Sequence, residues 1–461
     1  METGMDTAMP NHSRLSLYAH IGATLKLGLP LVGAQLAHLA INTTDTVMIG
    51  WLGTRELAAS VLAFQGYFIF MMLGSGFAHA IMPMVAQASG TGHVRTARRA
   101  VRMGLWIVTF FSALAMAALW HFEAILVALG QDADVAALSG DYMRIMQWSL
   151  FTMLFTFVMR SFLSALEHAR IVLIATILSA VLNAVVNYAL IFGKWGAPEL
   201  GLQGAAIASV ASSALAFIIL WVYALVVPAI RRYEIHVRPW RGDLRAFLEV
   251  LHLGWPISLT IIAEVGLFAG AAIMMGWIGP VELAAHGIAM QIISLVFMIP
   301  LGLSMAATIR IGSALGRGDH ANLTGIALSN YIIAGAVALT SAAALVLAPE
   351  PLIRLFLDLD NAQSAQVFAF GTTLLAVAAT FQLVDGVQAI AVGLLRGLKD
   401  MRVSMAFAVV SYWVVGMPLA YVLAFPAGFG GVGLWLGLAA GLLVAAIALT
   451  ARFFWKIARF R

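Results

Sequence analysis

Three acidic residues lie inside long apolar stretches of this 461-residue chain: Asp45, Glu264 and Asp385. A carboxylate at the centre of a bilayer costs about 2.5–3.5 kcal/mol on the insertion scale, so such residues usually face a cavity and have a function. Burial favours the neutral acid, whereas a nearby cation favours the carboxylate. Each acid could therefore hold a proton, a sodium ion or a cationic molecule in turn. The alternative is that each is a neutral, hydrogen-bonded acid that only joins two helices.

Asn183 and Asn187 are the polar residues that best complement Asp45. They are four positions apart in one apolar stretch, so both side chains project from one face of a helix. Their amide oxygens could join Asp45 in ligating a hard cation, or could hydrogen-bond its protonated form. Paired asparagines also bridge neighbouring membrane helices, and the sequence is equally compatible with that role.

Four other polar side chains in these stretches are candidates for a substrate-binding cleft: Gln35, Gln65, Gln291 and His286. His286 lies, like His38, in an alanine-rich stretch, which favours a hydrogen-bonded packing residue over a proton carrier. Some of the 22 methionines and 26 phenylalanines are expected to line a pocket that accepts varied apolar molecules.

The elements that carry these residues must be membrane-spanning helices. Hydrophobic residues make up 62% of the chain and charged residues 10%, whereas soluble proteins contain about 25% charged residues. Apolar runs of about 20 residues, the length that crosses a bilayer, recur throughout. Lipid offers no partner to a free backbone N–H or C=O, so each run must be a helix. We expect an all-α membrane protein with twelve transmembrane helices, at 21–50, 57–84, 99–120, 141–163, 170–192, 202–228, 248–276, 283–312, 325–348, 366–393, 403–425 and 431–455.

The basic residues predict how these helices are oriented. They gather in the connections that follow even-numbered helices, which include Arg95, Arg98, Arg99, Arg102, Arg231, Arg232, Arg238, Arg241 and Arg245. The connections after odd-numbered helices are mainly acidic. By the positive-inside rule both termini are therefore cytoplasmic. The net charge of +5 then needs no nucleic-acid partner, because no nucleic-acid domain fits between these helices.

The chain also repeats itself at a distance of 226 positions. Between 27–66 and 253–292, 14 of 40 residues are identical without a gap. An even number of helices in each half makes the halves parallel repeats, related by an axis along the membrane normal. We expect two six-helix lobes related by pseudo-two-fold symmetry, at 21–229 and 248–455, with a cytoplasmic linker at 230–247 and cytoplasmic tails at 1–20 and 456–461.

The acids do not follow this repeat. Asp45 aligns with Ala271, and Glu264 aligns with His38. The scaffold was duplicated but these charges were not, so the two lobes are not equivalent, and the broken symmetry indicates where each lobe binds.

Several kinds of chemistry are absent from the chain. It contains no cysteine, which excludes disulfides, thiolate metal sites and thiol catalysis. It has no phosphate-binding loop, no His-Glu-x-x-His zinc motif and no Gly-x-Ser-x-Gly elbow. No cofactor is expected, and an ion gradient is the remaining energy source. An intramembrane enzyme would need a His–acid or Ser–His constellation at one membrane depth, which these residues do not provide.

Two segments carry distinctive motifs. Thr44-Asp45-Thr46-Val47-Met48-Ile49-Gly50 resembles the first-helix signature of the multidrug and toxic compound extrusion family. The segment 381–388, running on to Asp400, resembles the tenth-helix motif of that family's NorM-type branch. The resemblance covers essentially the whole chain, and further similar segments are Ala263-Glu264-Val265, Ala284-Ala285-His286 and 183–188.

Two details refine this resemblance. The presence of both Glu264 and Asp385 favours the NorM-type branch over the DinF-type branch. The family often has glutamine directly after the Ala-Ala-His segment, and this chain has Gly287. A contact from that amide is therefore not expected here.

The resemblance implies a twelve-helix, two-lobe antiporter of the bacterial inner membrane, which exports cationic, amphipathic compounds against Na⁺ or H⁺ entry by alternating access. Its cation-linked positions correspond to Glu264 and Asp385 in one lobe and to Asp45, Asn183 and Asn187 in the other. Glu264 and Asp385 are the expected ligands if the ion is Na⁺, but a carboxylate pair serves protons equally well. No obligate protein partner is expected beyond the surrounding lipid bilayer.

A flippase for a lipid-linked precursor, from the same superfamily, is the alternative. Its cleft should be larger and more cationic, because it must hold phosphates. The charges singled out inside these helices are acidic, which favours the antiporter.

Overall fold

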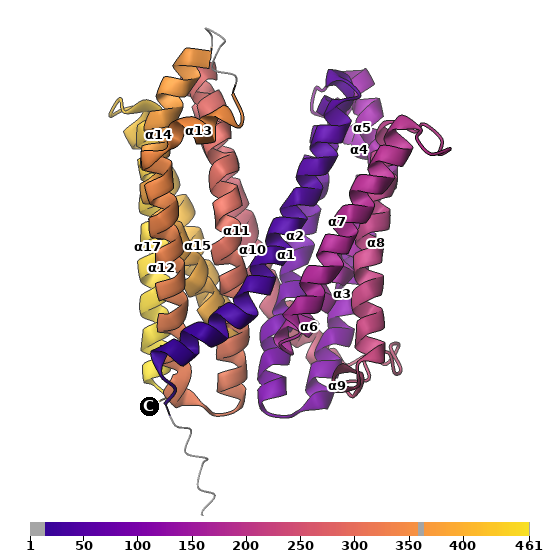
Figure 1. Ribbon diagram of the computed structural model, residues 1–461, viewed down its shortest axis with the longest axis vertical. Coiled ribbons are helices and arrows are strands. Elements are labelled where there is room, and N and C mark those ends of the chain that lie inside the picture. The colour runs from indigo at the N-terminus through magenta and orange to yellow at the C-terminus, as the bar shows by residue number, and fades with distance from the viewer. Residues whose placement is uncertain (1–13, 358–363, 461) are drawn as a thin grey trace, which may run out of the picture.

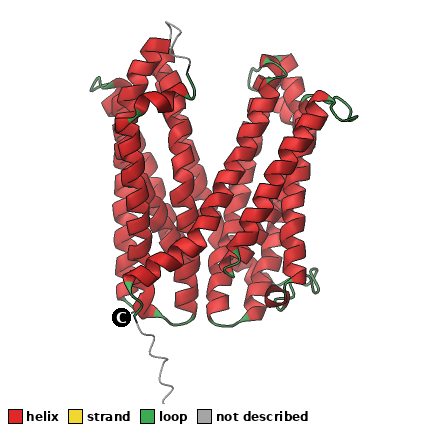
Figure 2. Ribbon diagram, viewed as in Figure 1, coloured by secondary structure: helices red, strands yellow, loops and turns green. Residues whose placement is uncertain are grey.

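The computed structural model describes residues 14–357 and 364–460. Most of the predicted N-terminal tail and the last residue of the predicted C-terminal tail lie outside these ranges. Within them every regular element is a helix (Figure 2). In chain order these are α1 (Leu17–Gly50), α2 (Thr54–Gly90), α3 (Val94–Leu119), α4 (Phe122–Ala128), α5 (Ala133–Met146), α6 (Ser149–Ala165), α7 (Ala169–Phe192), α8 (Leu202–Val226), α9 (Pro228–Arg231), α10 (Leu244–Ile278), α11 (Pro280–Gly316), η1 (His320–Asn322), α12 (Leu323–Leu347), α13 (Pro349–Arg354), α14 (Ser364–Gly397), α15 (Met401–Val409), the π-helix η2 (Val410–Gly416), α16 (Met417–Ala424) and α17 (Gly430–Ala458).

The predicted number of transmembrane helices is confirmed. In the described part of the chain, 11 helices or continuous helical segments are long and apolar enough to cross a membrane. The pair α5 and α6, which is bent by 46°, supplies a twelfth when it is counted as one span. This pair corresponds to the predicted helix at 141–163. The predicted helix at 403–425 corresponds to the continuous run α15–η2–α16.

Most helices begin earlier or end later than predicted. α1 begins at Leu17 rather than at residue 21, α2 continues to Gly90 rather than to 84, and α10 begins at Leu244 rather than at 248. Hydropathy marks only the segment that crosses the hydrocarbon. The backbone hydrogen bonds continue past that boundary into polar, arginine-rich turns, which apolarity alone does not reveal.

The helices form two bundles, one built mainly from α1–α8 and the other mainly from α10–α17 (Figure 1). Each bundle has its own apolar core. The first core includes Phe162 and Leu150, and the second includes Trp435 and Phe381. In Figure 1 the bundles meet at the lower end and diverge toward the upper end.

Two helices connect the bundles by crossing from one to the other. α1, which contains Pro30, bends on its way between them (Figure 1). Its Val32 belongs to the core of the second bundle, while Leu253 and Ile257 of α10 belong to the core of the first. Proline removes one backbone hydrogen bond and allows such a change of direction. The exchange is reciprocal, as expected for parallel repeats.

Glycines allow the bundles to approach closely where they meet. A Cβ atom on Gly28 would lie 2.9 Å from the Leu303 side chain, and one on the equivalent Gly254 would lie 2.4 Å from Phe77. Leu303 and Phe77 are themselves 226 positions apart. Any larger residue at either glycine would force the helices apart or displace its neighbour.

The same reciprocity recurs in two further glycine pairs. A Cβ on Gly76 would collide with Ser258, and one on Gly302 would collide with Val32. At the lower end, a Cβ on Gly90 would lie 2.4 Å from the Ser313 carbonyl oxygen, and one on Gly316 would lie 2.3 Å from that of Gln87. We call these three pairs (Gly28/Gly254, Gly76/Gly302 and Gly90/Gly316) the glycine seal.

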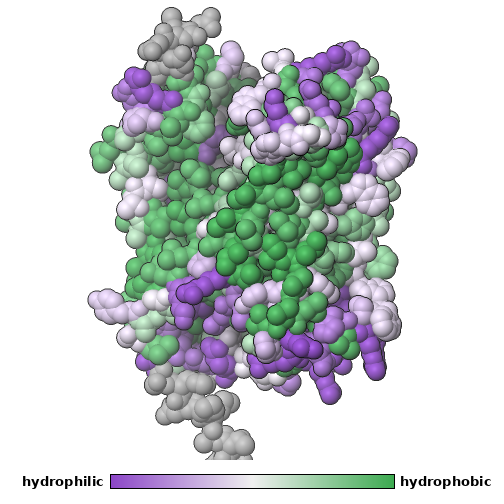
Figure 3. All heavy atoms as spheres, turned by 45° about the vertical axis from the view of Figure 1, so that its right-hand side comes forward, coloured by the Kyte–Doolittle hydropathy of each residue, from purple (hydrophilic) through white to green (hydrophobic). Residues whose placement is uncertain are grey.

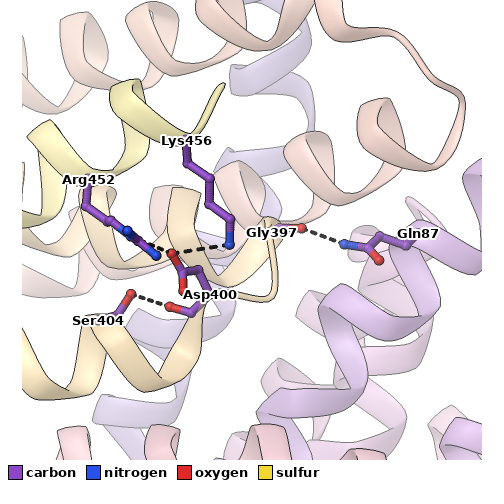
Figure 4. Close-up of polar contacts among 6 residues, drawn as sticks. All are labelled: Gln87, Gly397, Asp400, Ser404, Arg452 and Lys456. Carbon is purple, nitrogen blue, oxygen red and sulfur yellow. Dashed lines mark hydrogen bonds and ion pairs between the residues drawn. The ribbon is translucent and has the colours of Figure 1, made fainter. Parts of the chain in front are cut away.

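Polar contacts accompany the glycine seal (Figure 4). The Gln87 side-chain amide donates to the Gly397 carbonyl oxygen at 3.0 Å, which links α2 to the end of α14. Beyond Gly397, the Asp400 carboxylate lies 2.8 Å from Arg452 and 3.3 Å from Lys456 of α17. These ion pairs fix the turn after α14 against the last helix, so the carbonyl that Gln87 contacts is held in place.

The surface has the layering of a membrane protein. In the view of Figure 3, a band of hydrophobic side chains lies between hydrophilic residues at the two ends. Large apolar residues such as Leu114, Val181, Ile218 and Ile447 are exposed along the bundles. Soluble proteins rarely expose so much contiguous apolar surface. A surface that faces lipid is expected to be apolar.

Candidate functional site

A cavity of about 360 Å³ lies inside the first bundle. Its walls come from α1, α2 and α5–α8. Most of the surface that faces the cavity is apolar, although serines, threonines and other polar residues also line it. Asp45 and Gln65 line it together with Phe64, Phe157 and several methionines. A largely apolar pocket with a few polar groups is the usual form of a small-molecule site.

Asp45, on α1, is held by two donors at the wall of this cavity. The Asn187 side-chain amide of α7 donates to Asp45 Oδ1 at 2.5 Å, and the Ser209 hydroxyl of α8 donates to Oδ2 at 3.2 Å. The same Asn187 amide also donates to Asn183 Oδ1 at 3.1 Å. The structure therefore brings Asp45, Asn183 and Asn187 into one network, in which an amide N–H rather than an amide oxygen contacts the carboxylate. Their role in cation binding stays a prediction.

Both asparagines are fully buried, yet each keeps a free polar atom. Asn183 Nδ2 and Asn187 Oδ1 have no hydrogen-bond partner in the described part of the chain. A buried polar atom without a partner is costly and marks a place where another ligand can bind. Asn187 Oδ1 is an oxygen ligand of the kind that hard cations prefer.

The second bundle contains the other two acids. Asp385, on α14, is 2% exposed, and its Oδ1 has no partner in the described part of the chain. It interacts electrostatically with the partly buried Glu264 of α10, which in turn interacts with Arg396 near the end of α14. Two helices that come from distant parts of the sequence thus bring their carboxylates into one electrostatic cluster.

Tyr412 lies beside this cluster on η2. Its hydroxyl accepts a hydrogen bond from the Gln388 amide at 2.6 Å, and its electrostatic neighbours are Glu264, Asp385 and Arg396. No group of three or more His, Cys, Asp or Glu residues suitable for a metal ion occurs among the described residues. A cation held by Glu264 and Asp385 would therefore need further oxygen ligands, such as the free Gln382 Oε1, from elsewhere in the bundle.

The four candidates for the substrate cleft occupy different places. Gln65 lines the cavity of the first bundle. Gln35 does not line it, but its side-chain oxygen accepts a hydrogen bond from Arg160, which does. Gln291 is exposed on α11. Their substrate contacts remain predictions.

His286 is buried inside the second bundle. Its Nδ1 accepts a hydrogen bond of 3.1 Å from the indole N–H of Trp435, and the two rings pack edge to face with centroids 5.6 Å apart. Phe381 also packs edge to face with the same tryptophan, with ring centroids 5.5 Å apart. These contacts suit a packing residue, which was the favoured interpretation for this histidine.

Arg160, on α6, is a cavity residue that was not predicted. It is only 7% exposed, and it contacts Gln35 of α1 and, at 3.9 Å, the Met305 sulfur of α11. Its Nε has no partner within the described residues. The sequence did contain a signal, because Arg160 lies within the predicted helix at 141–163. The charges singled out inside the helices were all acidic, so this buried arginine was missed.

Comparison with known proteins identifies the family. The MatE family model matches residues 30–189 and 256–422, which is most of the chain. The probable multidrug resistance protein NorM of Agrobacterium fabrum is 48% identical over 438 residues, which cover 95% of this chain and 94% of that protein. The protein of the same name from Rhizobium meliloti is 48% identical over 97% of this chain and 94% of its own length.

The fold agrees with this assignment. The crystal structure of a mutant of the Vibrio cholerae MATE transporter VcmN superposes with a TM-score of 0.88 at 17% identity, over 96% of this chain and 98% of that one. The all-helical, two-lobe architecture is thus the one found in that structure. The similar NorM proteins are named as multidrug resistance proteins and not as enzymes. The chain belongs to the MatE family, and it is similar to the NorM proteins.

Proposed function

We propose that this protein is a secondary active multidrug efflux antiporter, which exchanges cationic, amphipathic compounds for Na⁺ or H⁺ by alternating access. The observation that carries the proposal is the position of Asp45, an acid held in the wall of a largely apolar, aromatic cavity. Such a cavity suits a molecule with an apolar body and a positive charge. The relatives named as NorM multidrug resistance proteins support the same function.

We assign different roles to the two lobes, defined as 21–229 and 248–455. The N-terminal lobe binds the exported compound next to Asp45, with Asn183 and Asn187 positioning that carboxylate. The C-terminal lobe binds the coupling cation at Glu264 and Asp385. The free oxygen of Asp385 supports this assignment, because an incoming ion does not have to displace an existing hydrogen bond there.

The proposed orientation places both termini in the cytoplasm of a bacterial cell and the transporter in the inner membrane. The arginines of the turns after α2, α8 and α14 lie at the end where the lobes meet, which by the positive-inside rule is the cytoplasmic end. The lobes diverge toward the other end (Figure 1). The conformation is then outward-facing, with the glycine seal closing the cytoplasmic side.

The flippase alternative is not favoured. Arg160 adds one positive charge to the cavity, but Asp45 lines the same cavity, and no other arginine or lysine does so among the described residues. A site for a polyphosphate headgroup would need several arginines or lysines in the cavity. The close relatives also carry the multidrug resistance name.

Reconstitution tests the proposal. Liposomes that contain the protein are loaded with a fluorescent cationic dye, and a Na⁺ or a pH gradient is imposed separately. We expect one of the two gradients to drive dye movement and the variant Glu264→Gln/Asp385→Asn to abolish it. The matched control is Asp134→Asn/Glu350→Gln, which neutralises two exposed carboxylates outside the proposed sites and should transport normally. Undiminished gradient-driven transport by the first variant would refute the cation site.

A further inference from the structure

A second pocket, of about 590 Å³, lies outside the transport site. It is formed by the first turns of α3 and by the segment 234–243, which precedes α10. Six arginines and two acids line it: Arg95, Arg98, Arg99, Arg102, Arg238, Arg241, Glu234 and Asp243. We propose that this pocket, the arginine pocket, binds the phosphate-bearing headgroup of an anionic membrane lipid.

The charges of the arginine pocket are only partly compensated. Arg98 pairs with Glu234 at 2.5 Å, and Arg99 pairs with Asp243 at 3.2 Å. The remaining exposed side chains, those of Arg95, Arg238 and Arg241, make no hydrogen bond or ion pair in the described part of the chain. Clustered arginines repel one another unless an anion lies between them, and a phosphate group matches the geometry of the hydrogen bonds that guanidinium groups donate.

Arg102 gives the arginine pocket a fixed, partly buried structure, so it is more than a patch of exposed charges. It is 8% exposed, and it donates to the carbonyl oxygens of Val237 at 2.8 Å and Arg241 at 3.2 Å. These bonds fold the segment before α10 over the start of α3. The Arg102 Nε keeps no partner among the described residues, so one buried donor remains available to a ligand.

The surroundings of the arginine pocket favour a lipid over a soluble anion. Trp240 and Leu244, next to the lining residues, are each 73% exposed. Trp106 donates from its indole N–H to the Pro239 carbonyl oxygen at 2.9 Å, which places a second tryptophan at the same edge. Exposed tryptophans are typical of the membrane interface, and basic pockets at the cytoplasmic face bind anionic headgroups. A free phosphate would use the arginines but not this apolar edge.

The arginine pocket is a property of one lobe and not of the repeated scaffold. A shift of 226 positions takes Arg95, Arg99 and Arg102 to Ala321, Gly325 and Leu328. None of these carries a charge. The arginines therefore do not serve a packing requirement that both lobes share, which supports a role in binding a ligand.

Native mass spectrometry of the full-length protein tests the proposal. The detergent-solubilised protein is titrated separately with phosphatidylglycerol, phosphatidylcholine and inorganic phosphate. We expect retention of phosphatidylglycerol only, with a loss of affinity on the order of tenfold or more in Arg95→Gln/Arg238→Gln/Arg241→Gln. These exposed residues can be changed without removing the Arg102 bonds that hold the segment in place.

The matched control is Arg170→Gln/Arg231→Gln/Arg245→Gln, which removes the same charge from exposed positions that do not line the pocket. It should bind phosphatidylglycerol like the unmodified protein. Equal losses in the two variants would mean attraction by general surface charge and overturn the proposal. Equal retention of phosphatidylcholine would exclude headgroup charge as the determinant. Displacement of the lipid by millimolar inorganic phosphate would identify a site for soluble anions instead.

Discussion

The two lobes are equivalent where they meet and different where they carry acids. At the meeting surface, Gly28 packs on Leu303 and its counterpart Gly254 packs on Phe77. Within the lobes, Asp45 is held by two hydrogen-bond donors, whereas Asp385 is buried with a free oxygen. The duplicated halves keep their symmetry where each must fit the other, and lose it at the buried acids, to which we assign different ligands.

The largest difference between the two lobes is expected when each acid is replaced by its amide and dye transport is measured. We expect Asp385→Asn to lower gradient-driven dye transport on the order of 100-fold, because an amide cannot hold a proton or counter a cation's charge in a buried site. Asp45→Asn should lower it less, about tenfold, by weakening dye binding while ion binding persists. Initial rates in dye-loaded proteoliposomes measure both effects.

Asp134→Asn, at an exposed position, is the control for both variants and should leave the rate unchanged. Dye binding to the purified protein distinguishes the two roles. A loss of dye affinity in Asp385→Asn that equals the loss in Asp45→Asn would contradict the division of labour between the lobes.

The glycine seal should respond symmetrically, in contrast to the acids. Gly90→Leu and Gly316→Leu each place a side chain against a backbone carbonyl of the other lobe. Overpacking of this kind costs about 1–3 kcal/mol, so each variant should shift the population toward the state with separated cytoplasmic ends, by about 5- to 150-fold. The two shifts should be similar in size.

Spin labels can report this shift, because the chain has no native cysteine. Labels at Thr91→Cys and Ala321→Cys, both exposed, lie on opposite lobes, and the distance between them should lengthen. Gly287→Leu, at a glycine that faces open space on α11, is the control and should leave the distances unchanged. A shift in only one of the two seal variants would show that the lobes do not close reciprocally.

The sequence predicted the fold well because both of its main signals can be read without knowing the tertiary structure. Apolar runs mark the helices, and the internal repeat marks the two lobes. The helices, the two lobes and the aligned pairs such as Gly28/Gly254 follow from runs of apolar residues and from the 226-residue shift. Helix ends were less accurate, since the helices at Leu17 and Gly90 extend into polar turns. The break between α5 and α6 was not predicted, because its residues remain apolar enough to continue a span.

The site was predictable only where a residue type is unusual in a membrane. Asp45 and Asp385 are conspicuous in apolar stretches, and the i, i+4 spacing placed Asn183 beside Asn187. Which helix supplies the second donor to Asp45, here Ser209 of α8, depends on packing between distant segments. The arginine pocket likewise depends on the segment before α10 folding over α3, which no local pattern reveals.

Arg160 gives a further test of how the N-terminal lobe differs from the C-terminal lobe, with a smaller expected effect. Its guanidinium lines the same cavity as Asp45 and opposes the binding of a cation there. We expect Arg160→Met, which keeps the apolar stem, to bind tetraphenylphosphonium about three- to tenfold more tightly. Isothermal titration of the purified protein measures the change. Arg170→Met, at an exposed position, should have no effect, and weaker binding by Arg160→Met would mean that Arg160 supports the site instead.

The smallest effects are expected for two single substitutions, one at the packing residue His286 of the C-terminal lobe and one at the cavity residue Gln65 of the N-terminal lobe. His286→Leu leaves the buried indole N–H of Trp435 without an acceptor, which costs about 1–3 kcal/mol and should lower Tm by a few degrees. The transport rate per folded molecule should not change. Gln65→Leu should do the opposite, because Gln65 is exposed to the cavity: Tm stays constant while KM for the dye changes a few-fold. Thermal unfolding and dye transport on the same preparations measure both, and a changed KM in His286→Leu would place that histidine in the substrate path.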